Sequence, residues 1–350
     1  MAAYTTIDDP EAYFQVVLYT GDGSVDQDIT FGGTNDMQPD LVWQATRNTT
    51  SERNIYDSVR GVKKRLHSED SEAETTRNGV ISFDSDGFSV GDHSGSNTNT
   101  NTYANWCWKA GGSGSANEDG SVNTTATSVN STSKFSIGIY TGTGSAGMTV
   151  GHGLGVAPDF IVVKKRGAAD RWCAYNSANT SAPETEAIYL SETDATADDA
   201  DFWNDVAPSS SLVTFGDKGD INATVTTVMY CWSAVQGFSK FGSYTGNGNA
   251  DGTFVYTGFR PAWIMCKRSS STENWAIVDD QRDGYNVDND QLFANTTAAE
   301  ITNDRMDILS NGFKCRTTNT EWNASGSTYI YAAFAKAPFV NSNGVPCNAR

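Results

Sequence analysis

The sequence repeats itself three times, and this repetition constrains the fold more than any other feature. A Tyr-Thr-Gly-x-Gly motif opens each copy, at Tyr19, Tyr140 and Tyr244. A proline-led apolar run follows, starting at Pro39, Pro158 and Pro261. An aromatic run closes each copy, with its main aromatic residue at Trp108, Trp232 and Phe334. Because these landmarks keep their order and spacing, we expect three tandem structural repeats.

Two further residue types recur at matching positions between these landmarks, and we call the second of them, the acidic residue, the acidic column. A leucine recurs at Leu66, Leu190 and Leu292, and eight residues after it comes an acidic residue, at Glu74, Asp198 and Glu300. Ser71 and Thr297 precede their glutamates by three residues, which is the spacing of a helix capping box. We therefore interpret the acidic column as a structural cap and expect one short helical turn there in each copy.

Each copy is expected to fold as β structure. Val, Ile, Tyr, Trp and Thr gather in short runs that Gly, Asn, Asp and Ser interrupt, as in strands joined by tight turns. The predicted class is all-β, with three tandem β-sandwich-like repeats of about 100 residues each. The expected divisions are repeats at 1–110, 135–238 and 239–340, a Gly/Ser/Asn/Thr-rich linker at 111–134, and a C-terminal tail at 341–350. Within that linker, residues 121–127 alternate weakly and can form an edge strand.

The charge balance disfavours two classes of partner. The chain has 24 Lys+Arg against 42 Asp+Glu and a formal net charge of −18. Phosphate backbones and anionic membrane surfaces both attract clustered basic residues, so we expect no nucleic-acid partner. No apolar run is long enough for a membrane span, so we expect no membrane insertion.

The cysteines and the N-terminus point to a protein made in the cytosol. The six cysteines form no Cys-x-x-Cys pair, and several lie beside aromatic residues in strand-like runs, so we expect reduced, buried side chains. The N-terminal residues show neither a basic nor an apolar segment of a signal peptide, so export by that route is not expected.

The repeat landmarks resemble those of a known family, the repeat domain of tailed-bacteriophage virion proteins of the marine and cyanobacterial phage type. The resemblance is carried by Tyr-Thr-Gly-Asn-Gly at 244–248 and Val-Ala-Pro-Asp-Phe-Ile-Val-Val at 156–163. It is also carried by Asp-Ser-Val-Arg-Gly-Val at 57–62 and Tyr-Ile-Tyr-Ala-Ala-Phe-Ala at 329–335. It extends over nearly the whole chain.

This resemblance implies a non-enzymatic structural protein located in the virion. The expected role is a tail fibre or tail-associated component in host attachment, with other virion proteins and a host surface glycan or protein as partners. A homo-oligomer is expected, with a trimer favoured. Two alternatives stay open: a decoration protein of the capsid or neck, and a tail protein that binds or degrades glycans.

No catalytic constellation, metal or cofactor is predicted. The three histidines, His67, His93 and His152, occupy unmatched positions in the repeats, and a nucleophile needs a positioned base. Residues 279–290 have the spacing of a calcium-binding loop, but the third position is Gln and the last is Asp. A polar loop between strands is the favoured interpretation.

Two groups of side chains are candidates for contacts with partners. Basic residues end all three proline-led strands, at Arg47, at Lys164, Lys165 and Arg166, and at Lys267 and Arg268. They either protect a strand end or contact a neighbouring subunit or an anionic glycan. Trp203 and Trp322 have no counterpart in the other copies, so we expect them at the surface as receptor or glycan contacts. The most variable segments, 91–103, 198–210 and 317–327, are the candidate recognition loops.

Overall fold

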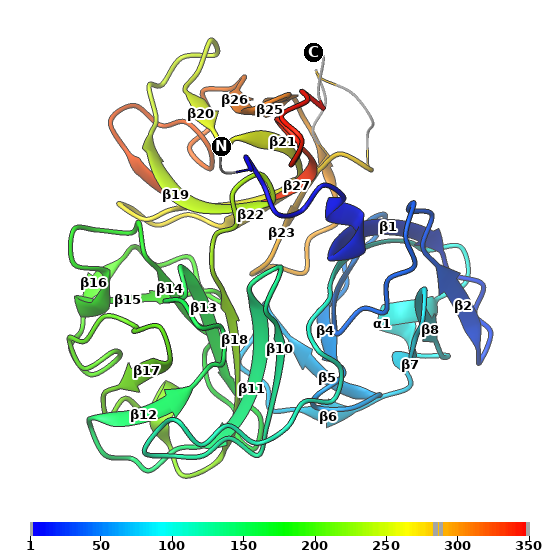
Figure 1. The fold of residues 1–350 in the computed structure, drawn as a ribbon. Helices are drawn as coiled ribbons and strands as arrows, with labels where there is room; N and C mark the ends of the chain where they lie inside the picture. Colours follow the sequence, from blue (N-terminus) through cyan, green and yellow to red (C-terminus); the bar gives the residue numbers. More distant parts are fainter. Residues whose placement is uncertain (1–2, 283–285, 287–289, 348–350) are drawn as a thin grey trace.

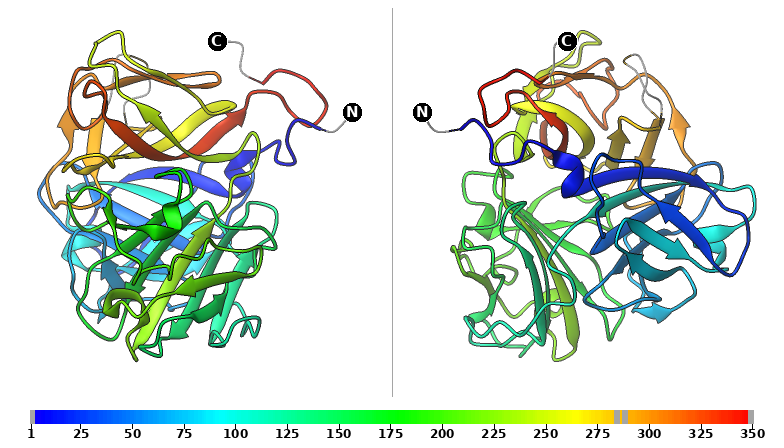
Figure 2. Two further views of the ribbon diagram at one scale, coloured as in Figure 1. Left: turned by 90° about the vertical axis from the view of Figure 1, so that its left-hand side faces the viewer. Right: turned by 45° about the vertical axis from the view of Figure 1, so that its right-hand side comes forward.

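The computed structural model describes residues 3–282, 286 and 290–347, and it is all-β (Figure 1). Strands hold 42% of the residues and helices 4%, so the predicted class is confirmed. Three units surround a common centre: unit 1 contains β1–β9, unit 2 contains β10–β18 and unit 3 contains β19–β27. The two ends of the chain lie on the same side of the molecule (Figure 2). Of the helices in the described ranges, none is long and apolar enough to cross a membrane.

Each unit contains one large antiparallel sheet, and the three large sheets have the same strand order. In unit 1 the order is β1 (Phe14–Thr20), β9 (Thr102–Trp108), β3 (Leu41–Thr46), β4 (Arg53–Asp57), β5 (Lys64–His67) and β6 (Thr75–Thr76). In unit 2 it is β11 (Phe135–Thr141), β18 (Thr226–Trp232), β13 (Phe160–Lys165), β14 (Cys173–Asn176), β15 (Glu186–Tyr189) and β16 (Ala197–Asp198). In unit 3 it is β19 (Ser239–Thr245), β27 (Thr328–Pro338), β21 (Phe259–Arg268), β22 (Trp275–Asp279), β23 (Asp290–Phe293) and β24 (Ile301–Thr302).

A smaller sheet packs on the outer side of each large one. These sheets are β2 (Gln27–Thr30), β8 (Gly87–Val90) and β7 (Val80–Asp84) in unit 1, β12 (Met148–Gly151) and β17 (Leu212–Phe215) in unit 2, and β20 (Phe254–Tyr256), β26 (Gly312–Cys315) and β25 (Met306–Leu309) in unit 3. The short helices are η1 (Pro10–Ala12), α1 (Ser94–Asn97), η2 (Pro183–Thr185) and α2 (Gly219–Asn222). Residues 71–74 and 297–300 are not helical, so the prediction of a helical turn from their capping-box spacing is wrong.

The opening and closing landmarks face each other on adjacent strands in the same register. Phe14 pairs with Trp108 in unit 1, and Phe135 pairs with Trp232 in unit 2. In unit 3 the position opposite Phe334 is Ser239. The three motif tyrosines all donate their hydroxyl to a backbone carbonyl of a short turn, at Ser96, Ile221 and Trp322 respectively.

Part of the segment expected to be a linker is a strand. β10 (Ala126–Asn130) pairs antiparallel with β11 and extends the large sheet of unit 2 at its edge. It lies slightly C-terminal to the alternating stretch at 121–127. β1 and β19 occupy the equivalent edges in units 1 and 3, and no strand in the described residues covers them.

Both faces of the central strands of each large sheet are buried, and the inner faces of all three sheets meet in one hydrophobic core. Trp108 shows how closely they meet: its ring lies 6.1 Å from that of Trp232 in unit 2 and 5.6 Å from that of Trp263 in unit 3. The outer faces pack against the small sheets in three separate cores, one in each unit. The division into separate domains stays a prediction, but the shared core favours units that fold together.

Backbone hydrogen bonds join the units in a closed ring. The segment between the fifth and sixth strands of each large sheet donates an N–H to the end of the third strand of the next unit. These bonds run from Glu74 to Arg166 O (2.9 Å), from Thr196 to Ser269 O (2.9 Å) and from Glu300 to Arg47 O (2.7 Å). A second set runs in the opposite direction, from Asp170 to Ser71 O (2.8 Å), from Glu273 to Thr193 O (2.8 Å) and from Ser51 to Thr297 O (3.0 Å). Each junction between units therefore has the same pair of bonds.

The shared core predicts that Trp108→Ala destabilises all three units at once. Removing the indole leaves a cavity at the point where the units meet, and the expected loss is about 3–5 kcal/mol of unfolding free energy. Hydrogen exchange measured by mass spectrometry should show faster exchange in the large sheets of every unit. Faster exchange confined to unit 1 would contradict a shared core.

Candidate functional site

The basic residues at the end of β13 lie at the junction between units 1 and 2. The Nζ of Lys164 donates to Ser71 O (3.0 Å) and to Asp170 O, and its side chain is buried. Burial lowers the pKa of Lys164 to about 8. Lys165 pairs with the Asp170 carboxylate. Arg166 donates two hydrogen bonds to Glu74, at 2.8 and 2.9 Å.

The equivalent residues of β21 lie at the junction between units 2 and 3. Lys267 is fully buried and donates to Thr193 O at 3.0 Å, as Lys164 does to Ser71 O. Arg268 donates to the hydroxyl of Ser327 within unit 3. Arg47, at the end of β3, pairs with Glu300 of unit 3. All six predicted basic residues therefore have partners inside the chain. Those that reach another unit join units of one chain, so the contact with an anionic glycan has no structural support.

Trp203 and Trp322 are both fully buried, so the expectation that they lie at the surface is wrong. Trp203 packs in the core of unit 2 and donates its indole N–H to Glu186 O at 3.1 Å. Trp322 packs in the core of unit 3 and donates to Gln291 Oε1 at 2.7 Å. Neither ring offers a face to a ligand. They lack counterparts because each outer core is filled by its own set of side chains.

The acidic column has a structural role at two junctions, and its middle member is two residues from the position expected. Leu66 pairs with Ile55 on β4, and the residue in that register position in unit 2 is Ile188, not Leu190. Eight residues after Ile188 comes Thr196, whose backbone N–H makes the ring bond described above. Asp198 lies exposed in β16.

Glu74 and Glu300 each bridge two arginines. Glu74 accepts hydrogen bonds from Arg166 and from Arg60, the latter at 3.0 Å, and Arg60 is bound in turn to Asp57. Glu300 accepts from Arg47 and from Arg282, the latter at 3.2 Å. Burial alone would raise the pKa of both glutamates, but hydrogen bonds and charge from the arginines hold each pKa below its usual value.

The third junction replaces this charged set with neutral residues. Asn176 stands in the register position of Asp57 and Asp279. Thr196 donates its hydroxyl to Asn179 Oδ1 at 2.9 Å, where the other junctions have a glutamate and an arginine. The partner of the aspartate changes as well. Tyr230 donates to Asp57 at 2.6 Å and Trp106 donates to Asp279 at 2.9 Å, whereas the equivalent residue in unit 3 is Ala332. The polar groups are therefore matched within every junction.

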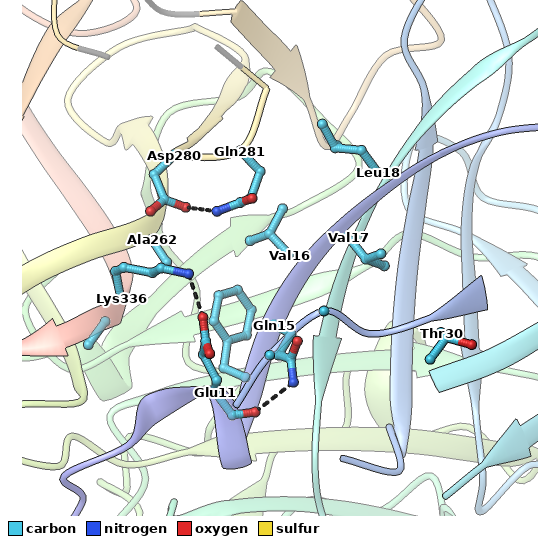
Figure 3. A pocket seen from close by; sticks show the side chains of 14 residues that line it. Glu11, Gln15, Val16, Val17, Leu18, Thr30, Ala262, Asp280, Gln281 and Lys336 are labelled. Carbon is cyan, nitrogen blue, oxygen red and sulfur yellow. Dashed lines mark hydrogen bonds and ion pairs between the residues drawn. The ribbon is translucent and has the colours of Figure 1, made fainter. Parts of the chain in front are cut away.

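A groove runs along the uncovered edge of β1, between units 1 and 3 (Figure 3). Its volume is about 370 Å³. We call it the β1 groove. Its floor is β1 itself, and one wall is the end of β2 at Thr30 with the following residues Gly32 and Gly33. The other wall is formed by residues of unit 3, namely Ala262, Asp280, Gln281, Ala335 and Lys336.

The polar groups of the β1 groove suit binding rather than catalysis. Lys336 Nζ is paired with Glu11 at 2.5 Å. Asp280 accepts a hydrogen bond from its neighbour Gln281 at 3.0 Å, and burial raises the pKa of Asp280 to about 6. Among the described residues, the lining of the groove contains no histidine or cysteine, so these residues include no activated nucleophile of the usual kind.

One group of side chains brings metal-ligand atoms together among the described residues: His67, Asp70 and Glu72. His67 Nδ1 lies 3.1 Å from Asp70 Oδ2, and Asp70 also accepts the backbone N–H of Glu72 at 2.9 Å. These bonds form a capped turn, so we assign the group to turn stabilisation. In the loop that resembles a calcium site, Asp279 binds Arg282 and Trp106, while residues 283–285 and 287–289 lie outside the described residues.

Three buried asparagines with equivalent structural roles were not predicted from the sequence. In each unit one asparagine accepts a backbone N–H from the Tyr-Thr-Gly-x-Gly turn and donates to a carbonyl two residues further along that turn. The three are Asn97 (2.9 and 3.0 Å), Asn222 (2.8 and 2.8 Å) and Asn323 (2.9 and 2.7 Å). Their signal was a recurrent Asn shortly before the closing strand. Two of these asparagines lie in the expected recognition loops 91–103 and 317–327, so buried hydrogen bonds within the chain hold these two loops in place.

The fold and the groove define an all-β protein of three sandwich-like units joined in a ring, with an uncovered sheet edge beside one junction. A family model described as a domain of unknown function (DUF7483) matches residues 9–338, and the chain belongs to this family. No curated protein and no solved structure matches the chain.

The charged junctions predict the effect of Glu74→Gln. The change removes the carboxylate that pairs with Arg166 and one of the two carboxylates that pair with the buried Arg60, which keeps Asp57. The free energy of unfolding at pH 7 should therefore fall by about 2 kcal/mol. Because the folded pKa of Glu74 is lowered, this stabilisation is complete above the unfolded pKa of about 4.5 and is lost as the pH falls through the folded value. Chemical unfolding of wild type and variant between pH 3 and pH 7 measures both effects.

Asp198→Asn is the matched control, since it removes an exposed carboxylate. Its expected effect is within about 0.5 kcal/mol. Equal losses for Glu74→Gln and Asp198→Asn would contradict the assignment of Glu74 to the junction.

Proposed function

We propose that the chain is a non-enzymatic virion structural protein of a tailed bacteriophage, acting as a tail fibre or tail-associated component in host attachment. The resemblance of the repeat landmarks to those of phage virion proteins suggests the setting. The observation that carries the non-enzymatic role is the use of the recurrent charged residues. Glu74 binds Arg166 and Glu300 binds Arg47 across two junctions, and each glutamate also binds an arginine of its own unit, Arg60 or Arg282. These charges are used in ion pairs within the chain.

A ring of three rigid units suits a structural role. Attachment proteins gain avidity from several weak contacts held on one body, and a shared core keeps the units in fixed relation. Neighbouring virion proteins and a host surface glycan or protein are the proposed partners. The proposed oligomer is a homotrimer, although a single chain already has three units around a centre and can face a threefold partner as one copy.

Immunogold electron microscopy of virions that carry this chain tests the location. Antibodies raised against the purified protein should label the tail, and the purified protein should reduce phage adsorption to host cells. A protein heated past its melting temperature controls for non-specific interference. Labelling spread over the capsid, with no effect on adsorption, would contradict the attachment role and favour a decoration protein.

One observation favours glycan binding as a second candidate function. Phe254 and Tyr256 are 45% and 48% exposed and alternate along β20 with the buried Val255. Lys240 Nζ lies 5.3 Å from the centre of the Tyr256 ring, and Tyr4 Oη lies 3.3 Å from Tyr256 Oη. Exposed aromatic rings beside polar groups suit stacking on sugar faces. These two residues replace Trp203 and Trp322 as the proposed glycan contacts.

The double variant Phe254→Ala with Tyr256→Ala should weaken binding to host surface polysaccharide about tenfold, a loss of about 1.4 kcal/mol. The matched control is Val25→Ala, which removes an apolar side chain that is 73% exposed in unit 1. Binding can be measured by biolayer interferometry on immobilised polysaccharide. Equal binding by the double variant and the wild type would rule out this surface.

A further inference from the structure

The edge of β1 that faces the β1 groove has unused main-chain groups. Tyr13 O accepts the N–H of Lys109, and Gly21 donates its N–H to Asn101 O. Because antiparallel partners bond at alternate residues, the odd-numbered residues of β1 bond to β9. The main-chain groups of Phe14, Val16 and Leu18 therefore point toward the groove, where no group among the described residues hydrogen-bonds to them.

In unit 2 the equivalent sheet edge is covered by a strand, which indicates what kind of segment can pair with the edge of β1. The residues of β11 in the same register positions are Phe135, Ile137 and Ile139, as the pairs Phe14–Trp108 and Phe135–Trp232 establish. β10 covers this edge as an antiparallel strand, with Ser128 opposite Ile137 and Asn130 opposite Phe135. Its five residues are Ala-Thr-Ser-Val-Asn, all uncharged and mostly small or β-branched.

β10 also contacts the end of the preceding unit and the segment that follows it, as an occupant of the β1 groove would. Asn130 Nδ2 donates to Ala110 O at 3.5 Å. Ser128 Oγ accepts the N–H of Gly111, and Thr127 exchanges two backbone bonds with Ser115, at 2.6 and 3.2 Å. The wall behind this segment contains Ser58, whose N–H donates to Asp40 O at 2.9 Å. In unit 3 the same bond runs from Asp280 to Ala262 O, also at 2.9 Å, and both residues line the β1 groove. The β1 groove is thus the counterpart of the place that β10 fills.

We propose that the β1 groove binds an extended segment of another polypeptide, which adds to β1 as an antiparallel strand. The segment should be uncharged and rich in small and β-branched residues, like β10. Main-chain hydrogen bonds to Phe14, Val16 and Leu18 supply the affinity, and the walls select side chains that fit. This inference does not depend on the partner being a virion protein.

A second copy of the chain is a poorer occupant than a free segment. The groove has a wall on each side of β1 and a volume of about 370 Å³, so it admits a single strand but not the edge of another folded sheet.

The probe is a fluorescently labelled peptide with the sequence of residues 123–131, Asn-Thr-Thr-Ala-Thr-Ser-Val-Asn-Ser. Fluorescence anisotropy with the full-length protein should show saturable binding. Val16→Pro removes an N–H that faces the groove and leaves the bonds to β9 in place, so it should weaken binding at least about tenfold. The matched control is Ser243→Pro on β19, an exposed edge position outside the groove, and it should bind as the wild type does.

Amide exchange measured by NMR on the wild-type protein gives a second test that needs no variant. Peptide binding should slow exchange at Val16 and Leu18 and leave Val17, already bonded to β9, unchanged. The proposal is overturned if the peptide shows no saturable binding up to millimolar concentration, or if it binds without protecting Val16 and Leu18. Dimers in light scattering whose formation protects these two amides would identify a second copy as the occupant and overturn it as well.

Discussion

Burial of the second face of each large sheet is the constraint on which the rest of this structure depends. A sandwich normally buries one face of each sheet and leaves the other to solvent, yet β3, β9 and β13 are buried almost throughout. The outer faces pack against the small sheets of their own units. The inner faces pack against one another, and aromatic side chains such as Trp108, Trp232 and Trp263 fill the space where the units meet.

This arrangement explains why buried polar and charged side chains are found at the junctions between units. Strands that approach a neighbouring unit carry their end residues out of solvent, so charged groups there need partners. Two junctions meet the need with arginine and glutamate, and one meets it with asparagine and threonine. The backbone bonds are the same in all three. The geometry is therefore set by the main chain, and the side chains vary in matched sets, as when Asn176 and Ala332 replace an aspartate and its donor.

The sequence predicted what depends on local pattern and missed what depends on the placement of units. The opening tyrosines and closing aromatics were found because each is fixed by a turn or a strand pairing. Leu190 was matched in place of Ile188 because a slip of two residues keeps a side chain on the same face of a strand, and both residues are buried in the shared core. Because of this two-residue error, Asp198 was aligned with Glu74 and Glu300, whereas the residue in the equivalent position is Thr196.

Other errors had the same origin. The basic residues at strand ends were expected to protect a strand end or to contact an outside partner. A sequence does not show that another unit of the same chain lies beside Lys164 and Lys267. Trp203 and Trp322 were placed at the surface because they do not recur, but equivalent backbones need not be packed with equivalent side chains. The β1 groove could not be predicted at all, because its two walls come from units 1 and 3.

The central claim is that the three units form one cooperative structure through their shared core. Differential scanning calorimetry of the intact chain tests this most directly, by comparing the calorimetric enthalpy of unfolding with the van't Hoff enthalpy. One cooperative structure predicts a single transition in which the two enthalpies agree. A calorimetric enthalpy about three times the van't Hoff value, or three resolved transitions, would contradict it, because the units would then unfold independently.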